Sequence, residues 1–274
     1  MRVFRSEWDR LMRPGVLLGG AGTIVGSALL VTAILFAIAK PAADITLADA
    51  AAGRAAVSRE MLEASDGMVS AFGLAGPLLG VICLVLFAQN LGAEYGHGTL
   101  KVLLLREPRR LRLLAGKAAA LGLLCVLAIA VAFVAQSLLA IVMAAARGIP
   151  ATAWFQPHGL AVAGLLLLRV VGAALAWGAI GLLLATLLRA SAPAVGIGIG
   201  YTIVAEPIVS LAFNQGAKYL PGRILQSFVA WGAAPPKGQP AGLDGPVSAV
   251  LLLVYLAVML GVAVTLFVRR DVEG

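Results

Sequence analysis

Charged residues are scarce in this chain. Asp, Glu, Lys and Arg together make up 12% of its 274 residues, whereas hydrophobic residues make up 61%. Because soluble chains carry roughly 25% charged residues, the composition excludes an ordinary soluble domain. The apolar stretches are each long enough to cross a bilayer, which takes about 20 helical residues. The sequence therefore predicts an all-α membrane protein.

Residue types that commonly carry chemistry are also scarce. The chain has two cysteines and two histidines. Cys83 and Cys125 fall inside apolar stretches, which argues against a disulfide framework or a CxxC site. His97 and His158 have no metal-binding spacing, and no predicted span contains a histidine or an aspartate. We therefore predict no catalytic residue and no metal site, and an intramembrane transferase or protease is disfavoured.

A nucleotide-binding loop is missing as well. No Gly-x-x-x-x-Gly-Lys-Ser/Thr motif occurs, since Gly116-Lys117 is preceded by leucines and followed by alanine. The chain is therefore expected to bind no cofactor and to have no ATPase site of its own.

Six apolar stretches are predicted to be transmembrane helices within one domain, residues 15–268. They cover residues 15–39, 67–91, 118–146, 159–188, 192–213 and 246–268. Thirteen of the 21 basic residues fall in the segments 1–14, 92–117, 189–191 and 269–274. The positive-inside rule then places both termini, including the tail 269–274, in the cytoplasm. Because the basic residues flank spans, the net charge of +8 indicates topology and not nucleic-acid binding.

The first 14 residues form an amphipathic pattern. Phe4, Trp8 and Leu11 share one side of the expected helix, and several arginines occupy the other. This pattern predicts an interfacial helix that lies in the membrane surface and is anchored in lipid by these three residues.

The segment 92–117 is the most basic of the interruptions between spans, with six of the 21 basic residues. Gly98 and Thr99 are placed to start a helix, on which Leu100, Leu103 and Leu104 share one face. Pro108 is expected to end that helix and to open a second short one. The segment is therefore predicted to form two short helices with a kink, although an ordinary positive-inside loop is the alternative.

The segment 214–245 contains the apolar-aromatic run YLPGRILQSFVAWG, which is too short to span and is bounded by prolines. It predicts a re-entrant segment or a pair of interfacial helices before the last span, with a plain surface loop as the alternative.

Two ionisable residues fall inside predicted spans. Arg169 and Glu206 lie at similar depths on adjacent antiparallel spans, so they are expected to form a pair or to face one water-filled cavity. Such a pair would serve either a substrate pathway or gate, or the register of two helices. Pro207 is expected to kink the fifth span.

The chain resembles the ABC-2 family, the membrane subunits of type V ABC exporters. In the segment 92–117 the resemblance rests on Glu94, Gly98-Thr99, Leu103–Leu105, Pro108 with the arginines after it, and Gly116-Lys117. The ending Phe267-Val268-Arg269-Arg270-Asp271-Val272 is also similar to that of the family. One departure is that Arg109 and Arg110 follow Pro108 directly, where many relatives have a small polar residue.

The resemblance implies a membrane permease subunit that works as a dimer with a second permease, the same or homologous, in a bacterial plasma membrane. A separate ATPase subunit would bind ATP and Mg. Segment 92–117 would be the coupling element on that subunit, with Glu94, Gly98, Thr99, Leu103, Pro108, Arg109 and Arg110 as its contact residues. The alternative is a membrane assembly or binding subunit that docks a different cytoplasmic partner through the same segment.

Overall fold

A computed structural model of the chain describes residues 2–41, 57–106, 109–213, 216–231 and 242–269. These residues are mostly helical, and the pairing of Lys40 with Ser58 is the one β-bridge that they form. The helices are α1 (Arg2–Leu11), α2 (Pro14–Ile38), α4 (Arg59–Glu63), α5 (Gly67–Gly96), α6 (Thr99–Arg106), α7 (Arg110–Arg147), α8 (Pro157–Leu188), α9 (Ser191–Gly200), α10 (Glu206–Ala212), α11 (Pro221–Val229) and α12 (Gly245–Arg269).

Six helices of the described residues are long and apolar enough to cross a membrane, which confirms the predicted number of spans. They are α2, α5, α7, α8, the run Ser191–Ala212 that contains α9 and α10, and α12. Two of them are longer than predicted at the end where α6 lies. The helix α5 continues to Gly96, and α7 begins at Arg110. The second short helix expected after Pro108 is therefore wrong, because those residues form the first turns of the third span.

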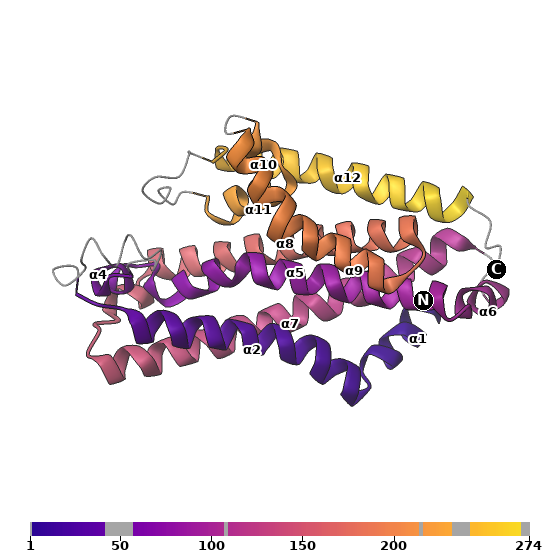
Figure 1. Cartoon of the computed structure of the whole chain (residues 1–274). Helices are drawn as coiled ribbons and strands as arrows, with labels where there is room; N and C mark the ends of the chain where they lie inside the picture. Colours follow the sequence, from indigo (N-terminus) through magenta and orange to yellow (C-terminus); the bar gives the residue numbers. More distant parts are fainter. Residues whose placement is uncertain (1, 42–56, 107–108, 214–215, 232–241, 270–274) are drawn as a thin grey trace.

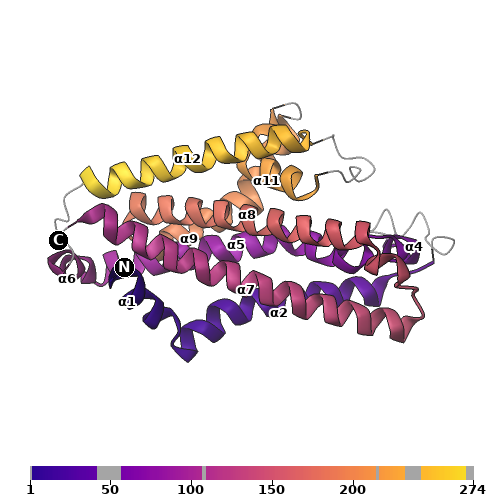
Figure 2. The same cartoon turned by 180° about the vertical axis from the view of Figure 1, so that it is seen from behind.

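The helix α5 lies at the centre of the bundle (Figures 1 and 2). It packs most extensively against α8, and it also packs against α2, α7 and α9. The helices α2 and α7 lie side by side, and α12 packs on α8 and α11. The main hydrophobic core accordingly contains side chains from α5, α7 and α8.

Glycines allow α5 and α8 to approach closely. A Cβ atom on Gly80 would lie 2.1 Å from Cδ1 of Trp177, and one on Gly181 would lie 2.2 Å from the backbone oxygen of Leu84. Van der Waals packing drives helix association in a membrane, and small residues at the crossing let the backbones meet. These glycines therefore fix how the two central helices cross.

The two ends of the bundle differ in content (Figure 1). We call the end that holds α1, α6, the start of α7 and the end of α12 the terminal end. At the opposite end, near α4, the Arg147 guanidinium donates hydrogen bonds to the carbonyl oxygens of Phe36 (2.6 Å), Ala37 (2.7 Å) and Ala39 (3.1 Å). These carbonyls belong to the last turn of α2 and to Ala39 directly after it, where backbone acceptors have no partner within the helix. Arg147 thus joins the ends of α2 and α7.

Large apolar side chains cover the outside of the bundle, above all on α10 and α12. Leu211 is 86% exposed, and Val250, Leu253 and Val258 of α12 are exposed as well. Such a surface suits a hydrocarbon environment, where apolar residues need no burial within the protein.

Candidate functional site

Four charged side chains meet inside the terminal end, and we call them the ion cluster: Glu7, Arg10, Glu94 and Lys117. The Lys117 ammonium is 1% exposed, and its Nζ donates hydrogen bonds to Oε1 of Glu7 (2.7 Å) and to Oε1 of Glu94. Arg10 donates from Nη1 to the same Oε1 of Glu94 (2.9 Å), and its Nη2 lies 3.4 Å from Oε2 of Glu7. Arg10 is 38% exposed, whereas the other three side chains are buried. The two carboxylates and two cations balance, as buried charges require.

The ion cluster joins three elements that lie far apart in the sequence. Glu7 and Arg10 come from α1, Glu94 from the last turns of α5, and Lys117 from α7. The close approach of α1 to α7 depends on Gly116, because a Cβ atom there would lie 2.8 Å from Cγ1 of Val3. Gly116 therefore leaves room for α1 to lie against α7, and the adjacent Lys117 pairs with the Glu7 carboxylate of α1.

Sequence reasoning missed Glu7, although a signal was present. Glu7 lies on the same face of α1 as Phe4 and Leu11, at the i+3 and i+7 spacing of a helix. An acidic residue on an apolar face needs a cation inside the protein. That argument points to a buried lysine or arginine but does not say which one.

The structure corrects the expectation that Glu94 contacts another subunit directly. Its side chain is 3% exposed and points into the ion cluster. Its second carboxylate oxygen, Oε2, is buried without a hydrogen-bond partner among the described residues. Glu94 is therefore placed to hold α1 and α7 against the end of α5, and any effect on a partner has to be indirect.

The short helix α6 begins where the sequence predicts. Gly98 has a φ of +67°, a left-handed conformation that favours glycine, and it separates α5 from Thr99 at the start of α6. Leu100 is buried and Leu103 partly buried in the main core. On the other face, Val102 is 55% exposed and Leu105 is 85% exposed. The helix α6 thus presents apolar side chains outward while its inner face is fixed.

The residues that follow α6 connect the third and sixth spans. Pro108 lies outside the described residues. Arg109 is exposed, and Nη1 of Arg110 donates to the backbone oxygen of Val268 (3.1 Å). The rings of Tyr95 and Phe267 meet edge to face with centroids 6.4 Å apart, so the end of α12 also contacts the end of α5.

The predicted lipid anchors of α1 are largely turned toward the protein. Leu11 is buried in the main core, and Phe4 and Trp8 stack on each other with centroids 6.1 Å apart while packing against that core. The expectation that Leu11 is a lipid anchor is therefore corrected, because α1 lies on α7 and buries this residue there.

Arg169 and Glu206 do not form the ion pair expected from the sequence. The Glu206 carboxylate accepts a hydrogen bond from the backbone N–H of Gly222 (3.2 Å), in the first turn of α11. The Arg169 Nη1 donates to the backbone oxygen of Trp231 (2.7 Å), just beyond the end of α11, and its guanidinium lies 5.0 Å from the centre of the Trp231 ring. A carboxylate at a helix N-terminus and a cation at its C-terminus both suit the helix dipole. The two charges therefore bind opposite ends of α11.

Pro207 follows an irregular stretch of the fifth span. Residues Tyr201–Ala205 form a π-helical turn, and the N–H of Glu206 donates to the carbonyl oxygen of Tyr201, five residues earlier. Proline removes a backbone donor, and a π turn is one way to accommodate the change. Glu206 lies at this irregularity, on the side that faces α11.

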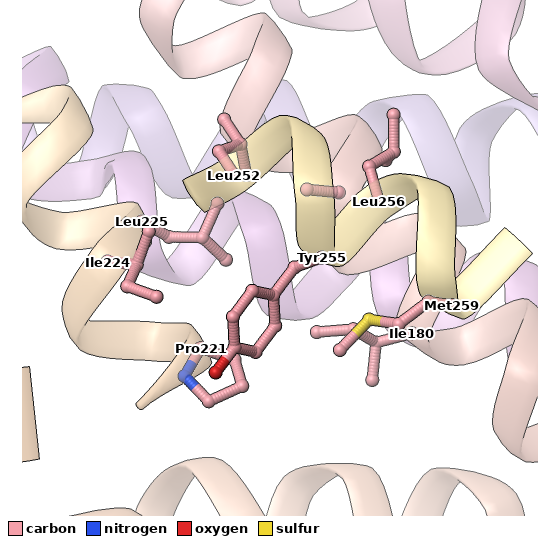
Figure 3. A pocket seen from close by; sticks show the side chains of 9 residues that line it. Ile180, Pro221, Ile224, Leu225, Leu252, Tyr255, Leu256 and Met259 are labelled. Carbon is pink, nitrogen blue, oxygen red and sulfur yellow. The ribbon is translucent and has the colours of Figure 1, made fainter. Parts of the chain in front are cut away.

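A small apolar pocket lies between α8, α11 and α12 (Figure 3). Its lining includes Ile180, Pro221, Tyr255 and Met259, and the Tyr255 hydroxyl donates to the backbone oxygen of Tyr219 (3.0 Å). The cavity volume is about 10 Å³, which is about the room that one water molecule needs. The pocket is therefore too small to hold a substrate in this conformation.

The six apolar helices and their exposed apolar surface define a multi-pass, all-α membrane protein. Within that class, the chain belongs to a family described as a protein of unknown function, DUF2705, whose model matches residues 28–273. No curated protein matches the chain. The family match begins within α2, so α1 with Glu7 and Arg10 precedes it.

Proposed function

We propose that this protein is the permease subunit of an ATP-driven ABC exporter of the ABC-2 type. In this proposal two permease subunits enclose the substrate pathway in a bacterial plasma membrane, and separate ATPase subunits bind ATP and Mg in the cytoplasm. The terminal end faces the cytoplasm. Exposed arginines at that end, among them Arg5, Arg13 and Arg109, support this orientation by the positive-inside rule.

The observation that carries the proposal is the arrangement of α6. It is a short helix between the second and third long helices, with Val102 and Leu105 exposed outward and Leu100 buried behind them. Neighbouring exposed apolar side chains on one face of a helix are typical of a surface that a partner protein covers. We assign this outer face of α6 as the contact with the ATPase subunit.

The ion cluster gives this contact a physical route to the spans. Thr99 Oγ1 lies 3.5 Å from the backbone oxygen of Glu94, so the start of α6 adjoins the residue that binds Lys117 and Arg10. A displacement of α6 would therefore act on α5, α7 and α1 together. Coupling of this kind requires that α6 contacts the ATPase with different free energy in the two states of the transporter.

Arg169, Glu206 and Pro207 are assigned to the part of the pathway away from the ATPase. The short helix α11 lies against α5, α8 and α12 and is bound at its two ends by these charges. We propose that α11 is the re-entrant segment of the permease and that the π turn beside Glu206 lets the fifth span bend when the pathway opens. Irregular backbone at membrane depth requires such cover by the rest of the protein.

The test is ATPase coupling in vesicles that contain the full-length protein and its co-expressed ATPase subunit. The double variant Val102→Ser/Leu105→Ser removes the outer face of α6, and we expect the ATPase to copurify at least about tenfold less well, as for loss of an apolar interface anchor. The matched control is Leu111→Ser, which removes an exposed leucine at the same end but outside α6. It should retain the ATPase.

Two results would count against the proposal. If no ATPase with a nucleotide-binding loop copurifies with the wild-type protein, the permease assignment fails. If a cytoplasmic protein without ATPase activity is instead lost in the α6 variant, the chain is a membrane assembly subunit.

A further inference from the structure

A groove with an unusual lining lies at the terminal end, between the first turn of α7 and the last turn of α12. Its lining residues among those described are Arg109, Arg110, Leu111, Arg112 and Val268, and we call it the arginine groove. Both views of the fold place these two helix ends side by side (Figures 1 and 2). The hydrogen bond from Arg110 to the Val268 carbonyl joins its two walls.

The charge of the arginine groove selects an anion. Three of its five lining residues are arginines, whose guanidinium groups stay protonated at any physiological pH. Arg109 and Arg112 have exposed side chains. Guanidinium groups form paired hydrogen bonds with carboxylates and with phosphates, and phosphate is the anion that phospholipid headgroups carry.

The apolar lining selects an amphiphile. Leu111 and Val268 are both exposed within the same groove. Two exposed valines of α12, Val250 and Val254, precede Val268 by eighteen and fourteen residues. These separations are close to whole numbers of helical turns, so the three valines share one face of α12 and offer apolar contacts to an acyl chain.

We infer that the arginine groove binds the phosphate headgroup of an anionic phospholipid, with an acyl chain along α12. The groove joins the ends of two membrane-spanning helices, which is the level of the lipid headgroups, and basic pockets between such helices commonly hold anionic lipid. This inference goes beyond the proposed function and does not depend on it. It also separates two surfaces of the terminal end, since α6 carries exposed apolar residues for a protein and the groove carries arginines for a lipid.

The experiment is native mass spectrometry of the full-length protein in detergent, titrated with phosphatidylglycerol or with phosphatidylcholine. Wild-type protein is expected to retain phosphatidylglycerol in preference to phosphatidylcholine. The variant Arg109→Gln/Arg112→Gln should weaken phosphatidylglycerol binding by about fivefold for each arginine removed, and so by about twenty-fivefold for the pair. Arg110 is left in place to preserve its bond to Val268.

A matched control removes the same charge from the same end. Arg5→Gln/Arg13→Gln removes two exposed arginines of the α1 region and should change phosphatidylglycerol binding by less than about twofold. The pair Arg109→Lys/Arg112→Lys keeps the charge and should recover part of the affinity. Gel filtration and thermal unfolding would check that each variant folds, and if the double variant does not, the two single variants are measured separately.

Four results would overturn the inference. Equal weakening by the control pair would show only a general effect of surface charge, and equal retention of both lipids would show no headgroup recognition. Displacement of phosphatidylglycerol by millimolar inorganic phosphate would identify a free-anion site. Unchanged lipid binding together with loss of the ATPase subunit from Arg109→Gln/Arg112→Gln would assign the groove to a protein.

Discussion

Charges in the ion cluster and charges elsewhere in the bundle are satisfied in different ways. In the ion cluster, Lys117 and Arg10 pair with the carboxylates of Glu7 and Glu94. Elsewhere, Arg147, Arg169 and Glu206 bind backbone groups at the ends of α2 and α11. The first arrangement requires three elements to be in place at once. The second requires only one side chain and one helix end.

This difference has an energetic consequence. Removing one member of a buried ion pair leaves an uncompensated charge, which costs about 3–5 kcal/mol. Removing a charged side chain from a helix end leaves backbone groups there without their hydrogen-bond partner. The loss of a hydrogen bond to a charged group costs about 1.5–3 kcal/mol. The terminal end should therefore respond to single substitutions more strongly than the rest of the bundle.

The largest effect is expected for Lys117→Met. The substitution removes the most buried cation and leaves Glu7 and Glu94 with Arg10 as their shared partner in the ion cluster. We expect a loss of about 3–5 kcal/mol in the free energy of unfolding, measured by titration with sodium dodecyl sulfate in mixed micelles.

A double substitution serves as the control for Lys117→Met. Adding Glu94→Gln removes the carboxylate that Lys117 leaves behind, so Lys117→Met/Glu94→Gln should be more stable than the single variant. A double variant at least as unstable as the sum of the two single variants would mean that the four charges do not act as one cluster.

A smaller effect is expected for Arg147→Met at the opposite end. Three carbonyl oxygens near the end of α2 lose their donor, and we expect a loss of about 2–3 kcal/mol by the same titration. Arg147→Lys should recover part of the loss, since an ammonium can reach fewer of the three oxygens. A loss above that of Lys117→Met would reverse the comparison between the two ends.

The sequence was sufficient to predict the six long helices and the start of α6. In a membrane, a continuous apolar run forms a helix because a helix satisfies its own backbone hydrogen bonds. Gly98 followed by Thr99 is a local signal for a helix boundary. The third long helix begins earlier than the predicted span, because Arg110, Arg112 and Lys117 interrupt the apolar run from which the span was predicted. In the structure these residues continue the helix beyond the apolar run.

The partners of the charges could not be predicted, because they depend on tertiary contacts. Arg169 and Glu206 were expected to meet on depth alone, but the short helix α11 offers both of them a backbone partner. Likewise, the expectation that Glu94 contacts a separate ATPase subunit came from the family resemblance, which does not specify the side chains that surround Glu94 in this chain. Only the docking of α1 brings Glu7 and Arg10 to it.

A third prediction concerns the charge at the start of α11. Glu206→Gln keeps an oxygen that can accept from the Gly222 N–H but removes the negative charge near the helix N-terminus. We expect a loss of about 0.5–1 kcal/mol, measured by the same titration, with faster amide hydrogen exchange in α11. Arg223 follows Gly222 in the first turn of α11 and is the charged residue next to this hydrogen bond. A loss as large as that for Lys117→Met would show that an ion pair with Arg223 is the main interaction.

The smallest effect is expected where Arg169 lies over Trp231. Trp231→Phe keeps the backbone oxygen that Arg169 binds but weakens the ring contact, so a double-mutant cycle with Arg169→Met measures the ring contact alone. We expect a coupling free energy of about 0.5–1 kcal/mol. A parallel cycle of Arg169→Met with Glu206→Gln should give a coupling near zero, because the two charges bind opposite ends of a helix about 13 Å long. A larger coupling in the second cycle than in the first would restore the direct Arg169–Glu206 pair and remove α11 as the partner of both.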